Sequence, residues 1–402
     1  MRIGIDLRWL HQALSHQSAE ECPGGIGAYS LYLTKHLLDV DAENSYLLFG
    51  SRAFSKELLA KHFPDGGRST IVLLPYPPAV KMAQATLGLI FKQLWEQVNI
   101  SPVLRTQKLD IMHFQEQGAI LHSQPYKTVL TVHDMMLSVY DRRYFNNGIS
   151  RWLWKKHVHN FNIANSIIAI SNSTKCDIVA YASVKPERIQ TIHYGLADVY
   201  KYKVDTAQVL DEKKKHGIND KYFLYVGGLQ FNKNIPGIIE AFYQAAASDH
   251  KVQLVMVGEH QFWPYQRDQL AKQLVQYELE QRVVFTGQLN WKRLKPLYAG
   301  AVALVHPALY EGFGFTPLEA MACGCPVITS RTSSLPEVVG DAALLVDPAN
   351  SGQIADFMRL LLLHPKEQER LRQKGLHRSR QFSWSVNAKC TLGIYQKTIE
   401  SR

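Results

Sequence analysis

Glu311 and Glu319 are the two residues whose type and spacing most clearly indicate chemistry. They are separated by seven residues in the segment 310–324, YEGFGFTPLEAMACG, which follows an apolar, strand-like run at 303–306. Glu319 fits a role at the start of a helix, whereas Glu311 precedes the glycines and has no such role. A carboxylate in the position of Glu311 can hold hydroxyl groups of a bound molecule or stabilise positive charge at a reacting carbon.

The same segment predicts where a helix begins. Thr316 suits the N-cap, Pro317 the first helical position and Glu319 the capping-box position three residues after the cap. The N–H groups of Phe315 and Thr316 would then face a phosphate at the helix start.

A glycine cluster, Gly24-Gly25-Ile26-Gly27, lies between a strand-like run at 2–7 and a helical pattern at 28–40. Glycine lets the backbone approach a ligand closely, and a helix N-terminus offers N–H groups to an anion such as a diphosphate. The alternative is a turn whose glycines serve only the backbone, and the residues alone leave both interpretations open.

Two further strand ends carry polar side chains. His133, followed by Asp134, ends the run 128–132 and could transfer a proton or orient a polar group. Lys233 lies in the loop 227–234, GGLQFNKN, and could neutralise a phosphate. The alternatives are that His133 is only a turn residue and that Lys233 is a solvated surface lysine.

The elements that must position these residues form two series of short apolar runs alternating with helical patterns. Such runs suit parallel strands covered on both faces, so the sequence predicts two doubly wound α/β domains. We expect an N-terminal domain at 1–200, a C-terminal domain at 201–384 and a last helix, 385–402, that packs back on the first domain. Ligands of such sheets bind at the carboxyl ends of strands, where the candidate residues lie.

The composition restricts the class of protein. The chain has 402 residues, 46% hydrophobic and 20% charged, with a net charge of +10 and five cysteines. These values indicate a soluble globular protein of a reducing compartment and exclude fibrous and disordered classes. No apolar run reaches the roughly 20 residues of a membrane span, and neither a nucleic-acid module nor a metal-ligand spacing is present in the sequence. The positive charge favours an anionic partner.

Together, GGIG at 24–27, His133-Asp134, the loop 227–234 and the E-x7-E segment resemble glycosyltransferase family 4, whose members have the GT-B fold of two Rossmann-like domains. The likeness extends over nearly the whole chain. The C-terminal half is most similar to enzymes that build bacterial O-antigens and exopolysaccharides, many of which use GDP-mannose. The resemblance implies retaining, metal-independent transfer of a hexose from a nucleotide-sugar to a glycan or lipid-linked glycan, in the cytoplasm or at the inner face of the membrane.

The resemblance also implies roles for individual residues. The N-terminal domain would bind the acceptor and the C-terminal domain the donor, with His133 and Glu311 as catalytic residues. The residues expected to bind the donor diphosphate and sugar are Gly25, Ile26, Gly27, Lys233, Gly314, Phe315 and Thr316, and those expected to bind the ribose and base are Glu319, Thr286 and Gly287. No cofactor and no metal are expected, since the nucleotide-sugar is a substrate.

One loop departs from the family pattern. Members often carry an arginine after the first glycine of this loop or just before its lysine, but these positions are Gly228 and Asn232 here. Lys233 would then be the only cation of the loop, unless Arg293 or Arg331 also reaches the diphosphate.

Several alternatives stay open at this point. The chain could be a UDP-sugar-dependent glycosyltransferase, a nucleotide-sugar epimerase of the same fold or a catalytically weak nucleotide-sugar binder, although such epimerases lack a segment like 310–324. The stretch 142–156 is basic and aromatic without an acidic residue, and the amphipathic stretch 80–98 precedes it. Contact with an anionic membrane is therefore a further hypothesis, and a solvated helix with its tryptophans in the core is the alternative.

Overall fold

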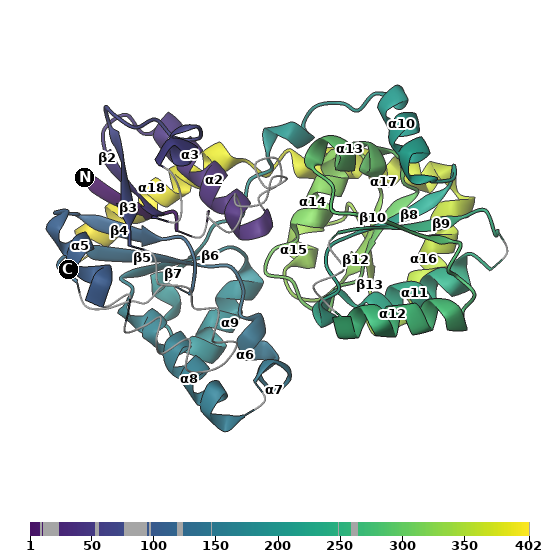
Figure 1. The fold of residues 1–402 in the computed structure, drawn as a ribbon, viewed down its shortest axis with the longest axis horizontal. Coiled ribbons are helices and arrows are strands. Elements are labelled where there is room, and N and C mark those ends of the chain that lie inside the picture. The colour runs from purple at the N-terminus through teal and green to yellow at the C-terminus, as the bar shows by residue number, and fades with distance from the viewer. Residues whose placement is uncertain are drawn as a thin grey trace. The chain divides into compact units, whose positions relative to one another are not determined.

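The computed structural model describes residues 1–8, 10, 24–52, 56–75, 95, 98–118, 124–145, 147–247, 249–258 and 264–401. The chain divides into two compact units, which are Met1–Gly195 with Trp384–Arg402, and Leu196–Ser383 (Figure 1). The division thus falls a few residues before the expected boundary at 200, and the last helix belongs to the first unit.

The first unit contains a seven-stranded parallel sheet in the order β3-β2-β1-β4-β5-β6-β7. Its strands are β1 (Arg2–Asp6), β2 (Ser45–Ser51), β3 (Ser69–Leu74), β4 (Ile111–Phe114), β5 (Lys127–Val132), β6 (Ser166–Ala169) and β7 (Ile189–Thr191). The described helices are α2 (Gly24–Val40), α3 (Lys56–Ala60), α5 (Ser101–Thr106), α6 (Met136–Val139), α7 (Asp141–Tyr144), α8 (Gly148–His159), α9 (Asn172–Ala182) and α18 (Trp384–Glu400).

The second unit contains a six-stranded parallel sheet in the order β10-β9-β8-β11-β12-β13. Its strands are β8 (Tyr222–Val226), β9 (Gln253–Val257), β10 (Val283–Gly287), β11 (Ala303–His306), β12 (Val327–Ser330) and β13 (Leu344–Val346). The described helices are α10 (Thr206–His216), α11 (Ile235–Ala245), α12 (Pro264–Gln276), α13 (Trp291–Gly300), α14 (Phe315–Ala322), α15 (Leu335–Val339), α16 (Ser351–Leu363) and α17 (Pro365–Ser379).

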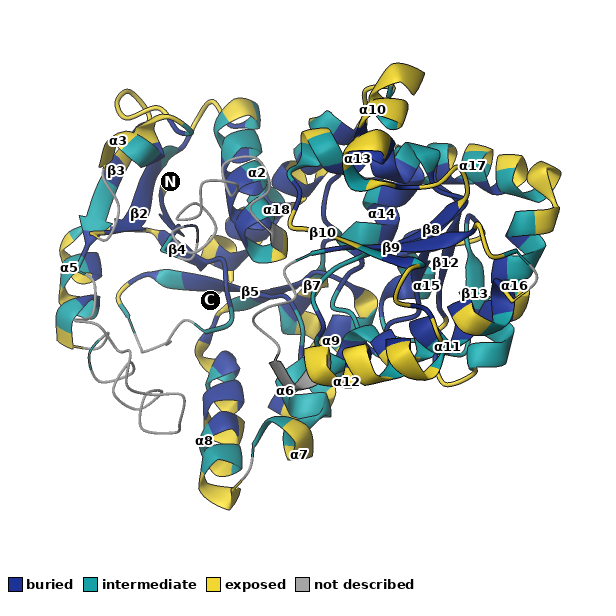
Figure 2. Ribbon diagram, turned by 45° about the vertical axis from the view of Figure 1, so that its right-hand side comes forward, coloured by how far each residue is buried: buried dark blue, intermediate teal, exposed yellow. Residues whose placement is uncertain are grey.

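The prediction of two doubly wound α/β domains is confirmed. Every apolar run predicted as a strand coincides with one, because strands covered on both faces need apolar side chains on both. Every residue of β9 and β11 is buried, for example. Figure 2 shows most strands of both sheets mainly in dark blue, whereas exposed residues, in yellow, lie largely on the surrounding helices and loops. In the described part of the chain, no helix combines the length and the apolar character that crossing a membrane requires.

The last helix, α18, is fastened to the first unit by polar contacts as well as by packing against α2. Tyr395 Oη and His113 Nδ1 are 2.6 Å apart, and Asn387 Nδ2 donates to the carbonyl of His193 at 2.7 Å. Where α18 starts, Gly195 lies directly against Trp384, and a Cβ atom on Gly195 would be only 2.2 Å from the Trp384 backbone nitrogen. This close approach requires glycine.

Replacing Gly195 by alanine is therefore expected to lower the free energy of unfolding by about 1–3 kcal/mol, the usual cost of overpacking. Urea unfolding followed by circular dichroism measures the effect. Gly393→Ala in the same helix is the matched control, because nothing lies within 4 Å of its added methyl group. That control should stabilise the protein by about 0.5–1 kcal/mol through helix propensity, and equal effects of the two changes would contradict the prediction.

Candidate active site

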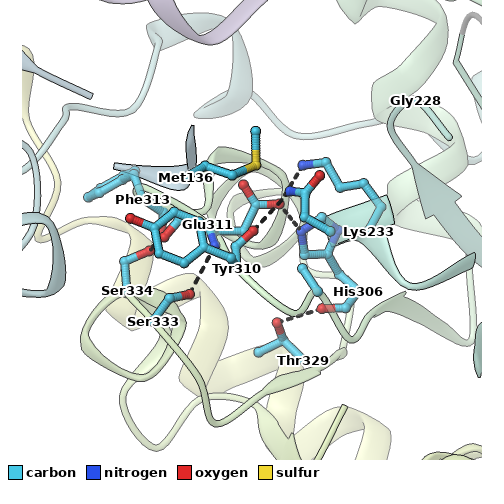
Figure 3. Close-up of polar contacts among 12 residues, drawn as sticks. Met136, Gly228, Lys233, His306, Tyr310, Glu311, Phe313, Thr329, Ser333 and Ser334 are labelled. Carbon is cyan, nitrogen blue, oxygen red and sulfur yellow. Dashed lines mark hydrogen bonds and ion pairs between the residues drawn. The ribbon is translucent and has the colours of Figure 1, made fainter. Parts of the chain in front are cut away.

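Glu311 lies between β11 and α14, and its carboxylate is held by two donors of the second unit. Lys233 Nζ and His306 Nε2 both contact Glu311 Oε1, the histidine at 2.9 Å (Figure 3). The Glu311 side chain is 16% exposed, whereas that of His306 is 1% exposed. None of the residues that the structure describes donates a hydrogen bond to Glu311 Oε2. Among the described residues, Oε2 therefore keeps its capacity to accept a hydrogen bond from a ligand.

Serine side chains fix the loop that carries Glu311. The N–H of Glu311 donates to Ser333 Oγ at 3.0 Å, and Ser334 Oγ donates to the Glu311 carbonyl at 2.8 Å. Ser333 has a φ of 51°, a left-handed conformation that is uncommon for residues with a Cβ atom. Such strain persists only where surrounding contacts enforce it, as they often do at functional sites. The position of Glu311 thus depends on residues that follow β12.

Lys233 ends the 3₁₀ turn η4 (Phe231–Lys233), and Asn232 ties this turn to the Glu311 loop. Asn232 is 5% exposed, and its Nδ2 donates to the carbonyl of Tyr310 at 3.0 Å. The Asn232 carbonyl in turn accepts the N–H of Leu309 at 2.7 Å. Asn232, one of the two positions where the sequence lacks the expected arginine, therefore joins the turn of Lys233 to the loop of Glu311.

The two other cations considered for the diphosphate have carboxylate partners in the second unit. Arg293 pairs with Glu212 at 2.7 Å, and Arg331 pairs with Asp347 at 2.7 Å. Among the described lysines and arginines, Lys233 is therefore the one that pairs with Glu311.

The charge state of this cluster follows from its contacts. Burial would raise the pKa of Glu311, but the charge of Lys233 and the hydrogen bond from His306 outweigh it and lower that pKa to about 2. Burial lowers the pKa of His306 despite its bond to the carboxylate. At neutral pH the cluster therefore combines a carboxylate, an ammonium group and a neutral imidazole.

The predicted capping box at Thr316 is wrong. Helix α14 begins at Phe315, and its N-cap is Gly314, with a φ of 118° and no side-chain cap. Glycine adopts this backbone conformation at little cost, so the turn into the helix forms two residues earlier than expected. Phe315 and Thr316 become the first two helical residues, whose N–H groups have no acceptor within the helix. The expected phosphate-binding geometry at Gly314, Phe315 and Thr316 stays a prediction.

Glu319 faces tyrosines instead of the helix start. Its carboxyl group accepts hydrogen bonds from Tyr298, at 3.3 Å, and from Tyr200. Burial raises the pKa of Glu319 to about 7, and the two tyrosines only partly offset this effect. Ribose binding by Glu319 stays a prediction, and Glu319 does not cap the start of α14.

Glu319→Gln should reveal this raised pKa in the pH dependence of stability. A carboxyl group whose pKa rises from 4.5 to about 7 on folding stabilises the protein below pH 4.5, and this contribution is lost as the pH rises through 7. From pH 5 to pH 8, the free energy of unfolding of wild type should fall by up to about 3 kcal/mol more than that of Glu319→Gln. Urea unfolding at the two pH values measures this difference. Parallel pH profiles for the two proteins would contradict this expectation.

His133 lies in the first unit, at the end of β5, and is 3% exposed. Its Nε2 lies 2.7 Å from the carbonyl of Gln115, so Nε2 carries the proton, and Nδ1 then accepts from Tyr194 Oη. Burial lowers the pKa of His133 to about 4, so the ring is neutral at neutral pH. A catalytic role for His133 stays a prediction. It would require a substrate group to replace Gln115 or Tyr194 as the hydrogen-bond partner of a ring nitrogen.

Gly25, Ile26 and Gly27 lie inside α2, which includes Gly24, and not in a loop ahead of it. The expectation of a helix starting at Ala28 is therefore wrong. Tyr29, one turn further along α2, packs edge-on against the ring of His133 at a centroid distance of 5.1 Å. The glycine segment and His133 thus belong to one neighbourhood of the first unit, but diphosphate contact stays a prediction.

Thr286 and Gly287 end β10 in the second unit. Gly287 has a φ of 72°, and Thr286 Oγ1 donates to the Gly287 carbonyl at 3.0 Å. The strand therefore finishes in a tight turn at the carboxyl edge of the sheet. The structure places these residues at such an edge, and contact with a base stays a prediction.

Sequence reasoning missed His306, Asn232 and Ser333 as members of the site. A signal existed for His306, which ends β11 five residues before Glu311. No local pattern pointed to Ser333, because its contact with Glu311 depends on the pairing of β11 with β12. Among the described residues, no group of three or more His, Cys, Asp or Glu side chains could hold a metal ion; metal independence stays a prediction.

Comparisons with known proteins agree with the fold. A crystal structure of Anabaena HepE in complex with UDP and glucose superposes with a TM-score of 0.72 and 18% identity, covering 100% of both chains. The two parallel-sheet units therefore form the GT-B fold. The family model "Glycosyltransferase Family 4" matches residues 23–198, and the model "Glycosyl transferases group 1" matches residues 208–378. The chain belongs to the glycosyltransferases that combine these two domains, as its motifs indicated.

Two of the similar proteins are mannosyltransferases from Escherichia coli. The O-antigen chain mannosyltransferase B is 26% identical over 379 residues, which are 92% of this chain and 96% of the relative. The serotype-specific mannosyltransferase WbdA is 28% identical over 281 residues, which are 69% of this chain but 34% of the relative. The chain thus spans about a third of the length of WbdA.

Proposed function

We propose that this protein transfers a hexose from a nucleotide-sugar to a glycan or lipid-linked glycan, with retention of the anomeric configuration. The first unit would bind the acceptor and the second the donor. The observation that carries the proposal is the pairing of Lys233 with Glu311 Oε1, while Oε2 accepts no hydrogen bond from the described residues. The cation suits a leaving diphosphate, and the carboxylate suits the hydroxyl groups of a sugar.

The chemistry of the donor site follows from this pair and from α14. A leaving nucleoside diphosphate needs positive charge and N–H donors, which Lys233 and the first amides of α14 would supply. In a retaining transfer the acceptor attacks the face that the leaving group departs from. The diphosphate itself can then take the proton of the acceptor, so no dedicated base is required.

Mannose is the hexose that the mannosyltransferase relatives favour, and GDP-mannose is the donor that the sequence resemblance implies. A UDP-sugar is the alternative, and the HepE structure with UDP and glucose supports it. A thermal-shift screen with GDP-mannose, UDP-glucose, UDP-GlcNAc and dTDP-rhamnose distinguishes them, because a ligand raises stability according to its excess over Kd. The proposal fails if no nucleotide-sugar shifts the melting temperature and none is consumed in the presence of glycan acceptors.

Two weaker alternatives are tested by the products. An epimerase would return a free epimerised nucleotide-sugar without transfer, and a catalytically weak binder would bind the donor without turnover. Proton NMR of the product also reads the anomeric configuration, and the reaction in EDTA tests independence from metal.

We also propose that the first unit contacts an anionic membrane through α7 and α8. Trp152 is 54% exposed and Ile149 is 69% exposed, and Lys156 Nζ lies 4.3 Å from the centre of the Trp152 ring. Trp154, by contrast, is 8% exposed and packs in the core. One of the two tryptophans therefore faces outward with basic neighbours, a combination that suits the interface of an anionic bilayer. The amphipathic stretch 80–98 lies almost wholly outside the described residues.

Sedimentation with phosphatidylcholine–phosphatidylglycerol vesicles tests this surface. Wild type should bind at low salt, and Ile149→Ser with Trp152→Ser should weaken binding by about tenfold, as expected for the loss of two large exposed apolar side chains. Val275→Ser, which removes an apolar side chain 61% exposed on the second unit, is the matched control. Wild-type protein that stays in the supernatant at every salt concentration would refute the proposal.

A further inference from the structure

His306 is the fixed partner of the Glu311 carboxylate. We propose that it is the positioning residue of the donor site: its Nε2–H holds Oε1 of Glu311 so that Oε2 stays directed at a hydroxyl group of the donor sugar, while Lys233 leaves the carboxylate for the diphosphate. This inference rests on the proposed function and deepens it.

The imidazole of His306 is immobilised from several sides. It ends β11, its side chain is 1% exposed, and its carbonyl accepts a hydrogen bond from Thr329 Oγ1 at 2.9 Å. The ring of Tyr225 stacks on it with an interplanar angle of 14° and a centroid distance of 6.5 Å. A side chain enclosed in this way keeps one rotamer, so it can define the position of the group that it binds.

The protonation of His306 follows from its two ring nitrogens. Nε2 lies 2.9 Å from the Glu311 carboxylate, which is ionised and can only accept, so Nε2 carries the proton. Nδ1 is buried and has no hydrogen-bond partner among the residues that the structure describes. A proton on Nδ1 would add an unsatisfied buried donor and a charge, and burial already lowers the pKa of this ring. His306 is therefore a neutral Nε2–H donor.

Lys233 is the movable partner in this cluster. Its ammonium group and His306 share the same oxygen of Glu311, but the lysine side chain is 19% exposed and reaches the carboxylate on a flexible stem. A diphosphate carries more negative charge than one carboxylate, so it can draw Lys233 away. Of the two present donors, His306 alone is then fixed in place, and it keeps Glu311 oriented in the loaded state.

The test compares His306→Phe with His306→Gln. Phenylalanine keeps a ring beside Tyr225 but removes the donor, whereas glutamine places an N–H close to the Nε2 position. We expect His306→Phe to weaken binding of the nucleotide-sugar and to lower kcat/KM on the order of tenfold to a hundredfold, the range for a lost hydrogen bond to a charged group. The affinity for the nucleoside diphosphate, which lacks the sugar, should stay within about threefold of the wild-type value, a change of less than 1 kcal/mol.

The conservative variant and a matched control complete the experiment. His306→Gln should recover most of the lost activity and selective sugar binding. His216→Phe removes another imidazole of the same unit that lies beside a carboxylate: its Nε2 is 3.1 Å from Glu212 on α10 and 2.9 Å from Arg293 Nη2. This change should alter neither affinity. Equal losses of nucleotide-sugar and nucleoside diphosphate binding, full activity in His306→Phe, or no rescue by glutamine would each overturn the inference.

A measurement on the wild-type protein gives an answer even if His306→Phe does not fold. Imidazole nitrogen-15 NMR should show His306 as the neutral Nε2–H tautomer at pH 7, before and after addition of the nucleoside diphosphate. A charged ring or an Nδ1–H tautomer would refute the assignment. If wild type binds neither nucleoside diphosphates nor nucleotide-sugars and transfers nothing, the proposed function itself fails, which is a different result from unselective loss in the variants.

Discussion

Glu311→Gln is expected to lower kcat for sugar transfer by on the order of a hundredfold or more, the scale of a lost charged group in a transition state. Glutamine has nearly the same shape, so the loop held by Ser333 and Ser334 should keep its structure. The change removes the negative charge that would face the sugar carbon as the diphosphate leaves. Initial rates of transfer with the preferred donor measure the effect.

Two further readouts separate this effect from simple misfolding. Lys233 loses its carboxylate partner in Glu311→Gln, so the nucleoside diphosphate should bind as tightly as in wild type or more tightly. Because folding lowers the pKa of Glu311 from 4.5 to about 2, its contribution to stability is present above pH 4.5 and is lost as the pH falls toward 2. The variant should therefore lose less stability than wild type over this acid range. Turnover within a few-fold of wild type would show that Glu311 is not in the site.

Lys233→Met is expected to lower kcat/KM for the donor by on the order of 10²–10³-fold, as the loss of a charge facing a leaving group does. The reason is that Arg293 and Arg331 are paired with Glu212 and Asp347, so neither replaces Lys233 without losing its own partner. Calorimetry should show weaker binding of the nucleoside diphosphate and a smaller dependence of that binding on salt.

The matched control for this change is Lys374→Met. Lys374 also pairs with a carboxylate of the second unit, Asp341 at 2.6 Å, but on the surface. Removing it should leave donor binding and turnover unchanged. Equal effects of the two lysine changes would mean that general positive charge, and not a specific contact, attracts the donor. The sequence departure at Gly228 and Asn232 makes this test informative, because the loop contributes one lysine and no arginine.

The positions of the strands along the chain could be predicted from the sequence because they are encoded locally. Parallel strands buried on both faces must be apolar along their length, and such runs are visible without any knowledge of their neighbours. Glu311 and Lys233 could likewise be named as candidates, since each follows a strand at the edge where ligands bind. Their motifs also sufficed to indicate the glycosyltransferase family.

Helix starts were less predictable, because glycine and proline permit more than one entry into a helix. The pattern Thr316-Pro317 suggested a cap, yet Gly314 takes the left-handed turn, and α14 begins at Phe315. Similarly, Gly25 and Gly27 lie in α2 although glycine disfavours helices. The choice between two neighbouring residues as the start of a helix changes the local free energy by only about 1 kcal/mol. The packing of the rest of the helix outweighs this difference.

The sequence by itself determined two doubly wound domains and a family, and it named a carboxylate and a lysine as candidates for a donor site. Only the tertiary structure decided that Lys233 and Glu311 meet, that His306 holds the same carboxylate oxygen, and that Ser333 fixes the loop. These contacts join β8, β11 and β12, which the chain separates by tens of residues and the sheet makes neighbours. Hydrogen bonds between such distant segments leave no periodic pattern in the sequence, because each depends on the register of strands and not on local spacing.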